Sequence, residues 1–212
     1  MKKLLFAVCA LAAISLLAPS AGFANTPDPA VWNNRIGFYT TATADGVSLP
    51  SMVPFTGFNV YMVLCNPTAE DGSSAAVDAY ECTVTVTGPA WFRLTETLNG
   101  SGALDVDAAA NGYAVGLASP MPPTNGLCLL ATWNCMLSAP ASSGSPWNMY
   151  MGPGTIPSVP GGFMAIDIPT STPLLQSCLP TSGNFALPVF SIGGTVTADE
   201  DVSFGAVKAL FR

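Results

Sequence analysis

The chain has 212 residues; half of them are hydrophobic, only 9% are charged, and the formal net charge is −7 at pH 7. A chain this rich in apolar residues is expected to fold, because disordered chains combine low hydrophobicity with high net charge. Six lysines and arginines are too few to build a basic surface, which argues against nucleic acid and against anionic membranes as partners.

The N-terminal residues 1–24 have the pattern of a secretory signal peptide. Two lysines precede an apolar run over residues 4–17, and small residues follow Pro19. This run is shorter than the roughly 20 apolar residues that a membrane-spanning helix needs. We therefore expect cleavage after Ala24 and a secreted product that is extracellular, periplasmic or held at the cell surface. No later stretch is expected to span a membrane.

The expected mature chain, residues 25–212, fits one domain of ordinary size. Without the two lysines of the signal it keeps four cationic residues against 13 acidic ones, which gives a formal net charge of −9. A surface with so few charges must be built from serine, threonine, asparagine, glycine and proline. Such a surface is typical of extracellular proteins and of proteins that assemble.

Short β-segments separated by turns follow one another along this mature chain. The period-two pattern is clearest in Tyr80–Thr87, where Cys82, Val84 and Val86 fall on one face and threonines on the other. An Asn-Gly pair at 99–100 is a strong hairpin signal. In chain order the predicted strands are Arg35–Thr41, Phe58–Cys65, Tyr80–Thr87, Trp91–Leu98, Asn111–Leu117, Leu127–Leu137, Trp147–Met151, Phe163–Ile168, Phe185–Ile192 and Val202–Phe211.

This succession of strands predicts an all-β fold. The connections hold most of the 19 prolines and 20 glycines, and no amphipathic helix of ten or more residues follows the signal. Many short strands with glycine and proline turns are typical of a sandwich or a barrel, and we expect a single antiparallel β-sandwich. Residues 140–160, rich in serine, glycine and proline, are predicted to be a long crossover.

Three features of the central part are combined in one known group of domains. They are a paired strand at Phe58–Cys65, an amphipathic strand at Glu81–Val86, and the sequence Gly126-Leu127-x-Leu129 at the start of a long core strand. Together, over residues 57–137, they resemble the cohesin-like and Ig-like sandwich modules of bacterial secreted proteins. The resemblance implies an Ig-like or cohesin-like sandwich that serves adhesion or assembly, and it supplies no catalytic or binding residues.

Five cysteines remain in the mature chain, at wide and irregular spacings. In an oxidising compartment they can form at most two disulfides with one thiol left over, and buried free thiols are the alternative. The chain has no histidine and no Cys-x-x-Cys pair, which argues against a zinc site. The disulfide candidates are Cys65, Cys82, Cys128, Cys135 and Cys178.

The sequence offers little for catalysis, and we predict no catalytic residue. Without histidine the usual base for a serine or cysteine nucleophile is missing. A glycosidase needs only two carboxylates about 5–10 Å apart in a cleft, so a carboxylate pair is the alternative. The acids considered are Glu70, Asp71, Asp78, Glu81, Glu96, Asp105, Asp107, Asp167, Asp199, Glu200 and Asp201.

Two further groups are candidate binding residues. Trp147, Tyr150 and Trp91 could form a recognition surface, because exposed aromatic side chains anchor protein interfaces and sugars; the alternative is a place in the core. The acidic run Asp199-Glu200-Asp201 is the candidate for Ca²⁺, which takes oxygen ligands, and a solvated acidic turn is its alternative. No other cofactor is expected.

These observations predict a secreted, non-catalytic β-sandwich module for extracellular adhesion, binding or assembly. Its partner would be a protein or a glycan at the cell exterior, or further copies of itself. Exposed aromatic residues on one sheet or an unpaired edge strand would favour this hypothesis. The alternative is a carbohydrate-active enzyme that uses a carboxylate pair.

Overall fold

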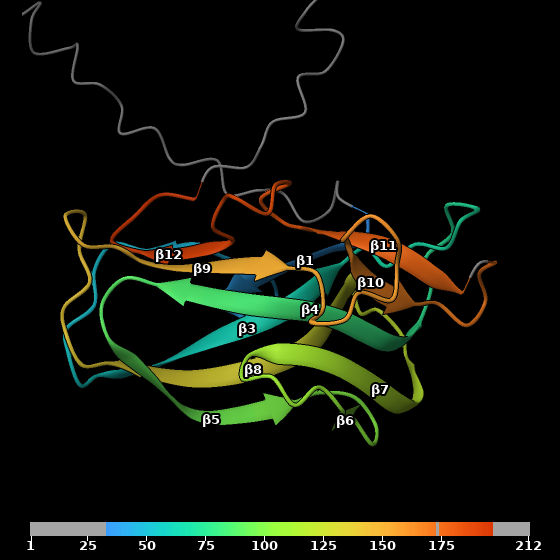
Figure 1. The fold of residues 1–212 in the computed structure, drawn as a ribbon, viewed down its shortest axis with the longest axis horizontal. Helices are drawn as coiled ribbons and strands as arrows, with labels where there is room; N and C mark the ends of the chain where they lie inside the picture. Colours follow the sequence, from blue (N-terminus) through green and yellow to red (C-terminus); the bar gives the residue numbers. More distant parts are fainter. Residues whose placement is uncertain (1–32, 173, 197–212) are drawn as a thin grey trace, which may run out of the picture.

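A computed structural model describes residues 33–172 and 174–196 of the chain. Within these residues every regular element is a β-strand, which confirms the all-β class, and twelve strands form a single sheet (Figure 1). The described part holds no helix with the length and apolarity needed to cross a membrane. The predicted signal peptide 1–24 and the last predicted strand, 202–211, lie outside the described residues.

The strands, in chain order, are β1 Arg35–Tyr39, β2 Ser48–Leu49, β3 Gly57–Cys65, β4 Val77–Thr87, β5 Trp91–Leu98, β6 Leu104–Asp105, β7 Gly112–Met121, β8 Leu127–Leu137, β9 Trp147–Gly152, β10 Met164–Asp167, β11 Leu175–Pro180 and β12 Phe190–Ile192.

Hydrogen-bonded neighbours follow the order β2-β12-β9-β4-β10-β11-β1-β3-β8-β5, with β7 also paired to β4 and β6 paired to β7. Most pairs are antiparallel, but β1 with β11 and β12 with β2 are parallel. The β1–β11 pair joins the half of the sheet that contains β3, β8 and β5 to the half that contains β4. The sheet is therefore continuous from β2 to β5.

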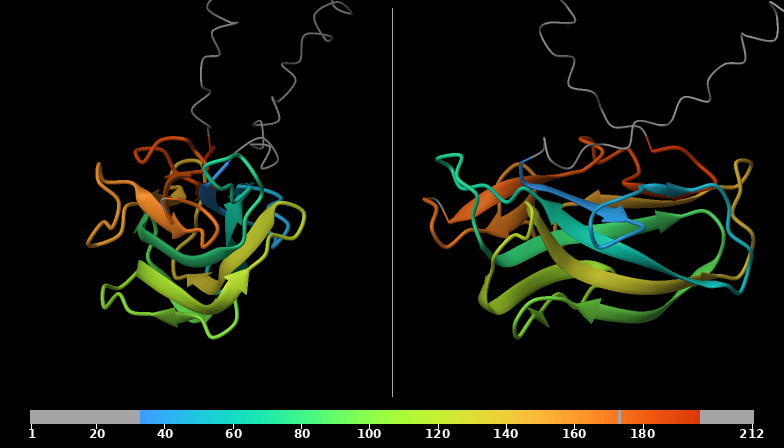
Figure 2. Two further views of the ribbon diagram at one scale, coloured as in Figure 1. Left: turned by 90° about the vertical axis from the view of Figure 1, so that its right-hand side faces the viewer. Right: turned by 180° about the vertical axis from the view of Figure 1, so that it is seen from behind.

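The sheet folds over on itself, so that its two halves face one another across a common core (Figure 2). Tyr113 of β7 stacks on Trp133 of β8 with ring centres 6.4 Å apart. The hydroxyl of Tyr80, on β4, donates a hydrogen bond to the carbonyl of Leu130, on β8, at 3.3 Å. Contacts of this kind bury the inward positions of both halves.

The burial pattern follows the alternation of the sequence. On β4, Cys82 and Val84 are buried, while Thr85 and Thr87 on the other face are exposed, as predicted. The predicted strands at 58–65, 91–98 and 127–137 coincide with β3, β5 and β8 within a residue. The short strands β2, β6 and β11 were not predicted; β2 and β6 have two residues each, which is too few to show a period.

The described cysteines form no disulfide, so the disulfide prediction is wrong for this structure and its alternative, buried free thiols, applies. The five thiols lie on β3, β4, β8 and β11 and are all buried, four of them in the main core and Cys65 in a smaller apolar cluster with Tyr39 and Val63. The Cys178 thiol donates to the Asn34 carbonyl at 2.7 Å, and Cys65 Sγ lies 3.3 Å from the Tyr39 hydroxyl. Burial raises the pKa of Cys65 to about 11 and that of Cys135 to about 12, so both are protonated at neutral pH.

Candidate functional site

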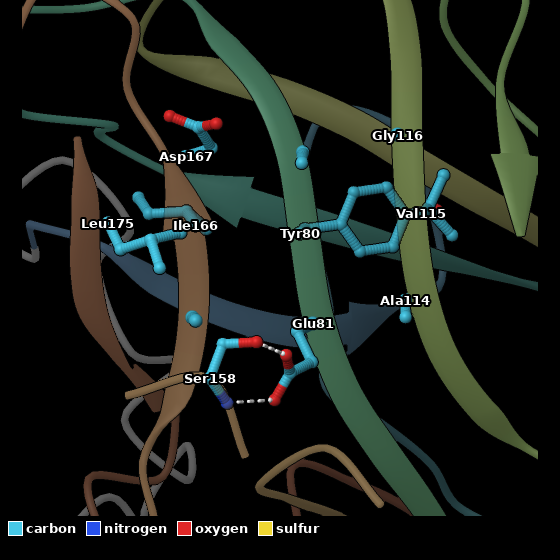
Figure 3. Close-up of a pocket in the computed structure, with 11 residues that line it drawn as sticks. Tyr80, Glu81, Ala114, Val115, Gly116, Ser158, Ile166, Asp167 and Leu175 are labelled. Carbon is cyan, nitrogen blue, oxygen red and sulfur yellow. Dashed lines mark hydrogen bonds between the residues drawn. The ribbon is translucent and has the colours of Figure 1, made fainter. Parts of the chain in front are cut away.

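The outer face of β4 is partly covered by the loop that follows β9. The hydroxyl of Thr83 donates to the carbonyl of Pro153 at 2.9 Å and fixes the start of this loop. Farther along, the backbone N–H of Ser158 donates to Glu81 Oε1 at 3.0 Å, and the Ser158 hydroxyl donates to Glu81 Oε2 (Figure 3). Gly154 packs directly on the Glu81 side chain, where a Cβ atom would collide with it. Glu81 thus holds the loop to the sheet.

This arrangement leaves two adjoining pockets on the outer face, which we call the β4 groove. The first has a volume of about 230 Å³ and the second about 370 Å³, and both are lined by Glu81 and Ala114. Asp167, Leu175 and Ser158 also line the first. The second is bounded by Val106 and Asp107 before β7 and by Thr155 and Ile156 of the loop. Glu81 and Ala114 therefore border both pockets of the β4 groove.

The groove combines exposed aliphatic side chains with carboxylates. Ile156 is 85% exposed and Val106 is 74% exposed, although both are large and apolar. Among the described residues the cationic side chains are Arg35 and Arg93, and neither lines the groove. The carboxylates of the groove, Glu81, Asp107 and Asp167, consequently have no cationic neighbour in its described lining.

Asp167 has the more unusual environment of the two carboxylates in the first pocket. Burial raises its pKa, and the nearby carboxylate of Asp78 raises it further. One carboxylate oxygen on each of Asp78 and Asp167 is buried without a hydrogen-bond partner among the protein atoms of the described chain. The uncharged form of Asp167 is therefore favoured relative to an aspartate in water.

Glu81 and Asp167 are diagonal neighbours on paired strands, because Glu81 lies opposite Ala165 and Asp167 lies opposite Ala79. Diagonal positions in an antiparallel pair are roughly 7–8 Å apart, which is within the range that two glycosidase carboxylates need. The two carboxylates, however, point away from one another in Figure 3, with that of Glu81 directed at Ser158. The pocket brings the two acids together without making them converge.

The aromatic residues singled out in the sequence do not form one surface. Trp147 is fully buried in the core and contacts Phe58 and Phe190 edge-on, because it occupies an inward position of β9. Trp91 is partly buried and stacks on Trp133 at 5.9 Å. Tyr150 alone lies on the outer face of β9, opposite Thr85. Trp147 therefore belongs to the core and not to a binding surface. Trp91, Trp147 and Tyr150 do not form a common exposed surface.

The predicted calcium ligands are Asp199, Glu200 and Asp201. They lie outside the described residues, so a calcium site there stays a prediction. In the part of the chain that the structure describes, no group of three or more acidic or cysteine side chains is placed to hold a metal ion. Residues 33–172 and 174–196 thus offer no built metal centre.

Sequence reasoning missed the groove itself. Glu81 and Asp167 were both among the candidate acids, but their positions are 86 apart in the chain and only the β4–β10 pairing makes them neighbours. A signal for the groove was present in Ile156, a large aliphatic residue inside a segment of proline, glycine and serine. An apolar side chain in such a loop indicates either a contact with the sheet below or an exposed binding surface.

Comparisons of the chain with protein-family models, with curated proteins and with solved structures gave no match. The interpretation of the groove therefore depends on its own geometry and chemistry.

Proposed function

We propose that this chain is a secreted, non-catalytic β-sandwich module, Ig-like or cohesin-like in architecture, that binds a protein at the cell exterior through the β4 groove. The observation that carries this proposal is the pairing of exposed Val106 and Ile156 with Glu81, Asp107 and Asp167 along one groove. Isolated apolar side chains on a surface are ordinary, but large ones that border carboxylates in a hollow are typical of binding sites.

The chemistry of the groove favours a peptide segment that carries both basic and aliphatic side chains. A lysine or arginine of the partner would find carboxylates without cationic neighbours, and a charge-assisted hydrogen bond contributes about 1.5–3 kcal/mol. Burial of each exposed aliphatic side chain would add about 1.5–3 kcal/mol. A segment that alternates the two residue types matches both features.

A protein partner is favoured over a glycan by the position of the aromatic residues. Sugars bind on the faces of exposed aromatic rings, but Trp133 and Trp147 lie in the core and Trp91 stacks on Trp133. The described lining of the β4 groove contains Tyr80 as its one aromatic residue, and the Tyr80 side chain is buried. The groove therefore has no described platform for a sugar ring.

The second candidate function is a carbohydrate-active enzyme. Its support is the presence of Glu81 and Asp167 in one pocket together with the raised pKa of Asp167, which suits a general acid. This function requires the two carboxylates to turn toward a common substrate, which the hydrogen bonds of Glu81 with Ser158 oppose.

The experiment measures binding of a fluorescent peptide of alternating lysine and leucine to the exported protein. We expect saturable binding that weakens with salt and falls about tenfold in Glu81→Gln and in Ile156→Ser. Asp45→Asn is the matched control, because it removes the same charge from the loop between β1 and β2 and should leave the affinity unchanged.

A panel of polysaccharides is tested in parallel for hydrolysis. Equal affinity of wild type and Glu81→Gln for the peptide would contradict the proposed groove. Polysaccharide hydrolysis that is lost in both Glu81→Gln and Asp167→Asn would contradict the non-catalytic role and establish the enzyme.

A further inference from the structure

A row of five outward-facing residues crosses the sheet at the first pocket of the β4 groove. Each member lies directly opposite the next, from β6 through β7, β4 and β10 to β11, and directly opposite residues of paired strands share one face of the sheet. The row consists of Leu104, Gly116, Ala79, Asp167 and Leu175. Its two ends are therefore large and apolar, whereas its middle has no side chain larger than a methyl group beside one carboxylate.

The two leucines at the ends of the row border the first pocket from opposite sides. Leu175 lines the pocket, and Leu104 lies beside Gly116 on the neighbouring strand. Leu104 is 65% exposed and Leu175 is 41% exposed, so both present apolar surface to a ligand. Figure 3 shows Gly116 on β7 and Asp167 on β10, with β4 between them. The pocket is thus an apolar hollow with a carboxylate on one side.

Gly116 keeps this pocket open. A Cβ atom at Gly116 would meet no other atom within 4 Å, and the φ angle of Gly116 lies outside the left-handed region. By contrast, a Cβ atom at Gly37 would collide with Thr181, and one at Gly112 would collide with Asp107. Neither packing nor backbone conformation therefore requires glycine at position 116. A glycine inside a strand weakens the strand and often marks the close approach of a ligand.

The size of the pocket matches one large apolar side chain. Its volume is about 230 Å³, and an apolar cavity of about 150 Å³ is enough to hold a benzene molecule. A leucine or phenylalanine side chain therefore fits, with Leu175 at its side and the backbone of β7 beneath it. An alanine side chain would leave most of the pocket empty, so the pocket discriminates between apolar residues by size.

The charge of the lining favours a basic residue close to this apolar side chain. Asp167 lies opposite Ala79, and Glu81 lies two residues farther along β4 on the same face, so two carboxylates border the pocket. The cationic side chains of the described residues, Arg35 and Arg93, are absent from its lining. A lysine or arginine of the partner is attracted here, and an acidic residue is repelled.

We propose that the first pocket of the β4 groove is an anchor pocket for one leucine- or phenylalanine-sized side chain of the protein partner. The partner segment that supplies this side chain also carries a basic residue. The inference rests on the proposed function and names the residue type that the groove selects. Gly116 is the specificity-determining residue, because any side chain at this position would occupy the space that the side chain of the partner needs.

The experiment compares two fluorescent peptides of equal length and charge for binding to the exported protein. One alternates lysine and leucine, and the other alternates lysine and alanine. The wild type should bind the leucine peptide at least tenfold more tightly, because only leucine fills the pocket. Gly116→Val fills the pocket from within. It should lower the affinity for the leucine peptide about tenfold and keep that for the alanine peptide within twofold of the wild type.

Two further variants control this result. Gly144→Val is the matched control, because a Cβ atom there also meets nothing within 4 Å and Gly144 lies in the loop between β8 and β9, outside the lining of the groove; it should bind both peptides as the wild type does. Leu104→Ser changes an exposed side chain beside the pocket and should lower the affinity for the leucine peptide alone, about threefold. Because valine favours strands, Gly116→Val should have a urea midpoint no lower than that of the wild type.

Folded Gly116→Val that binds the leucine peptide as tightly as the wild type would overturn the anchor pocket, and so would an equal loss for both peptides. If Glu81→Gln loses binding in the same series, the groove stands and only the anchor pocket fails. If the wild type binds neither peptide, the proposed function fails and the anchor pocket fails with it. A wild-type dimer that Gly116→Val converts to a monomer in light scattering would also overturn the proposal, since the pocket would then hold a second copy.

Discussion

Replacement of Trp133 by phenylalanine tests how the two halves of the sheet are held together. The Trp133 indole N–H donates to Glu96 Oε1 at 2.9 Å and to the Tyr113 hydroxyl at 2.7 Å, and the Arg93 guanidinium lies 4.5 Å from the centre of its ring. Trp133 is fully buried and also contacts the ring of Phe38 at 5.1 Å. One side chain thus links β8 to β5, β7 and β1.

The expected loss of stability has two parts. Loss of the hydrogen bond to a carboxylate costs about 1.5 kcal/mol, at the low end for charged partners because Glu96 is partly exposed. The smaller phenylalanine ring leaves a cavity whose cost is about 1–2 kcal/mol. Trp133→Phe should therefore lower the free energy of unfolding by about 3 kcal/mol, and Trp133→Ala by about 5 kcal/mol. Trp91→Phe, at a partly buried site, should cost about 1 kcal/mol.

Urea denaturation followed by far-UV circular dichroism measures these changes without depending on tryptophan fluorescence. A double-mutant cycle of Trp133→Phe with Glu96→Gln isolates the hydrogen bond, and a coupling free energy of about 1 kcal/mol is expected. If the two substitutions are additive, or if Trp133→Phe costs no more than Trp91→Phe, the indole hydrogen bonds do not stabilise the bridge between the halves.

Three further predictions concern other parts of the core and the groove. In a chain that begins at residue 25, the five described thiols should not react with Ellman's reagent in the native state, because all five are buried. All five should react after unfolding without reductant, and fewer would reveal disulfides. Because the native pKa of Asp167 is raised, the native state holds this proton more tightly than the unfolded state, and stability falls as the pH rises above about 4. At pH 7, Asp167→Asn should therefore have a higher urea midpoint than the wild type, whereas at pH 3 the two midpoints should be equal. Equal midpoints at both pH values would contradict the raised pKa. Gly88→Ala should lower the free energy of unfolding by about 3 kcal/mol in urea denaturation, because Gly88 has φ +108° and faces the Pro146 carbonyl. Gly72→Ala, at φ +83° in open space, should lower it by about 1 kcal/mol. Equal losses would contradict the close packing at Gly88.

The sequence predicts the long strands well, for a physical reason. β3, β4 and β8 each have nine or more residues, so several periods of the pattern are present and the buried face is evident from composition. The burial of Cys82 and Val84 follows directly from the alternation in β4. Pairs such as β1 with β11 bring together residues 144 apart, and no local pattern specifies them.

The candidate site was less predictable than the fold. An aromatic residue on a strand is as compatible with the core as with a binding surface, and the inward register of β9 decides the matter for Trp147. Glu81 and Asp167 line one pocket only because β4 pairs with β10. The loop that covers β4 is held by Ser158 and Gly154, whose roles depend on the position of Glu81 and have no separate sequence pattern.

Chemical-shift mapping on the ¹⁵N-labelled protein, titrated with the lysine–leucine peptide, shows whether the peptide binds in the β4 groove. We expect saturable shifts of the backbone amides of Glu81, Val106, Ile156 and Asp167, all of which line the β4 groove, with β3 and β8 unaffected. Shifts confined to other strands, or no shifts at peptide concentrations that saturate binding, would contradict the assignment of the groove as the binding site.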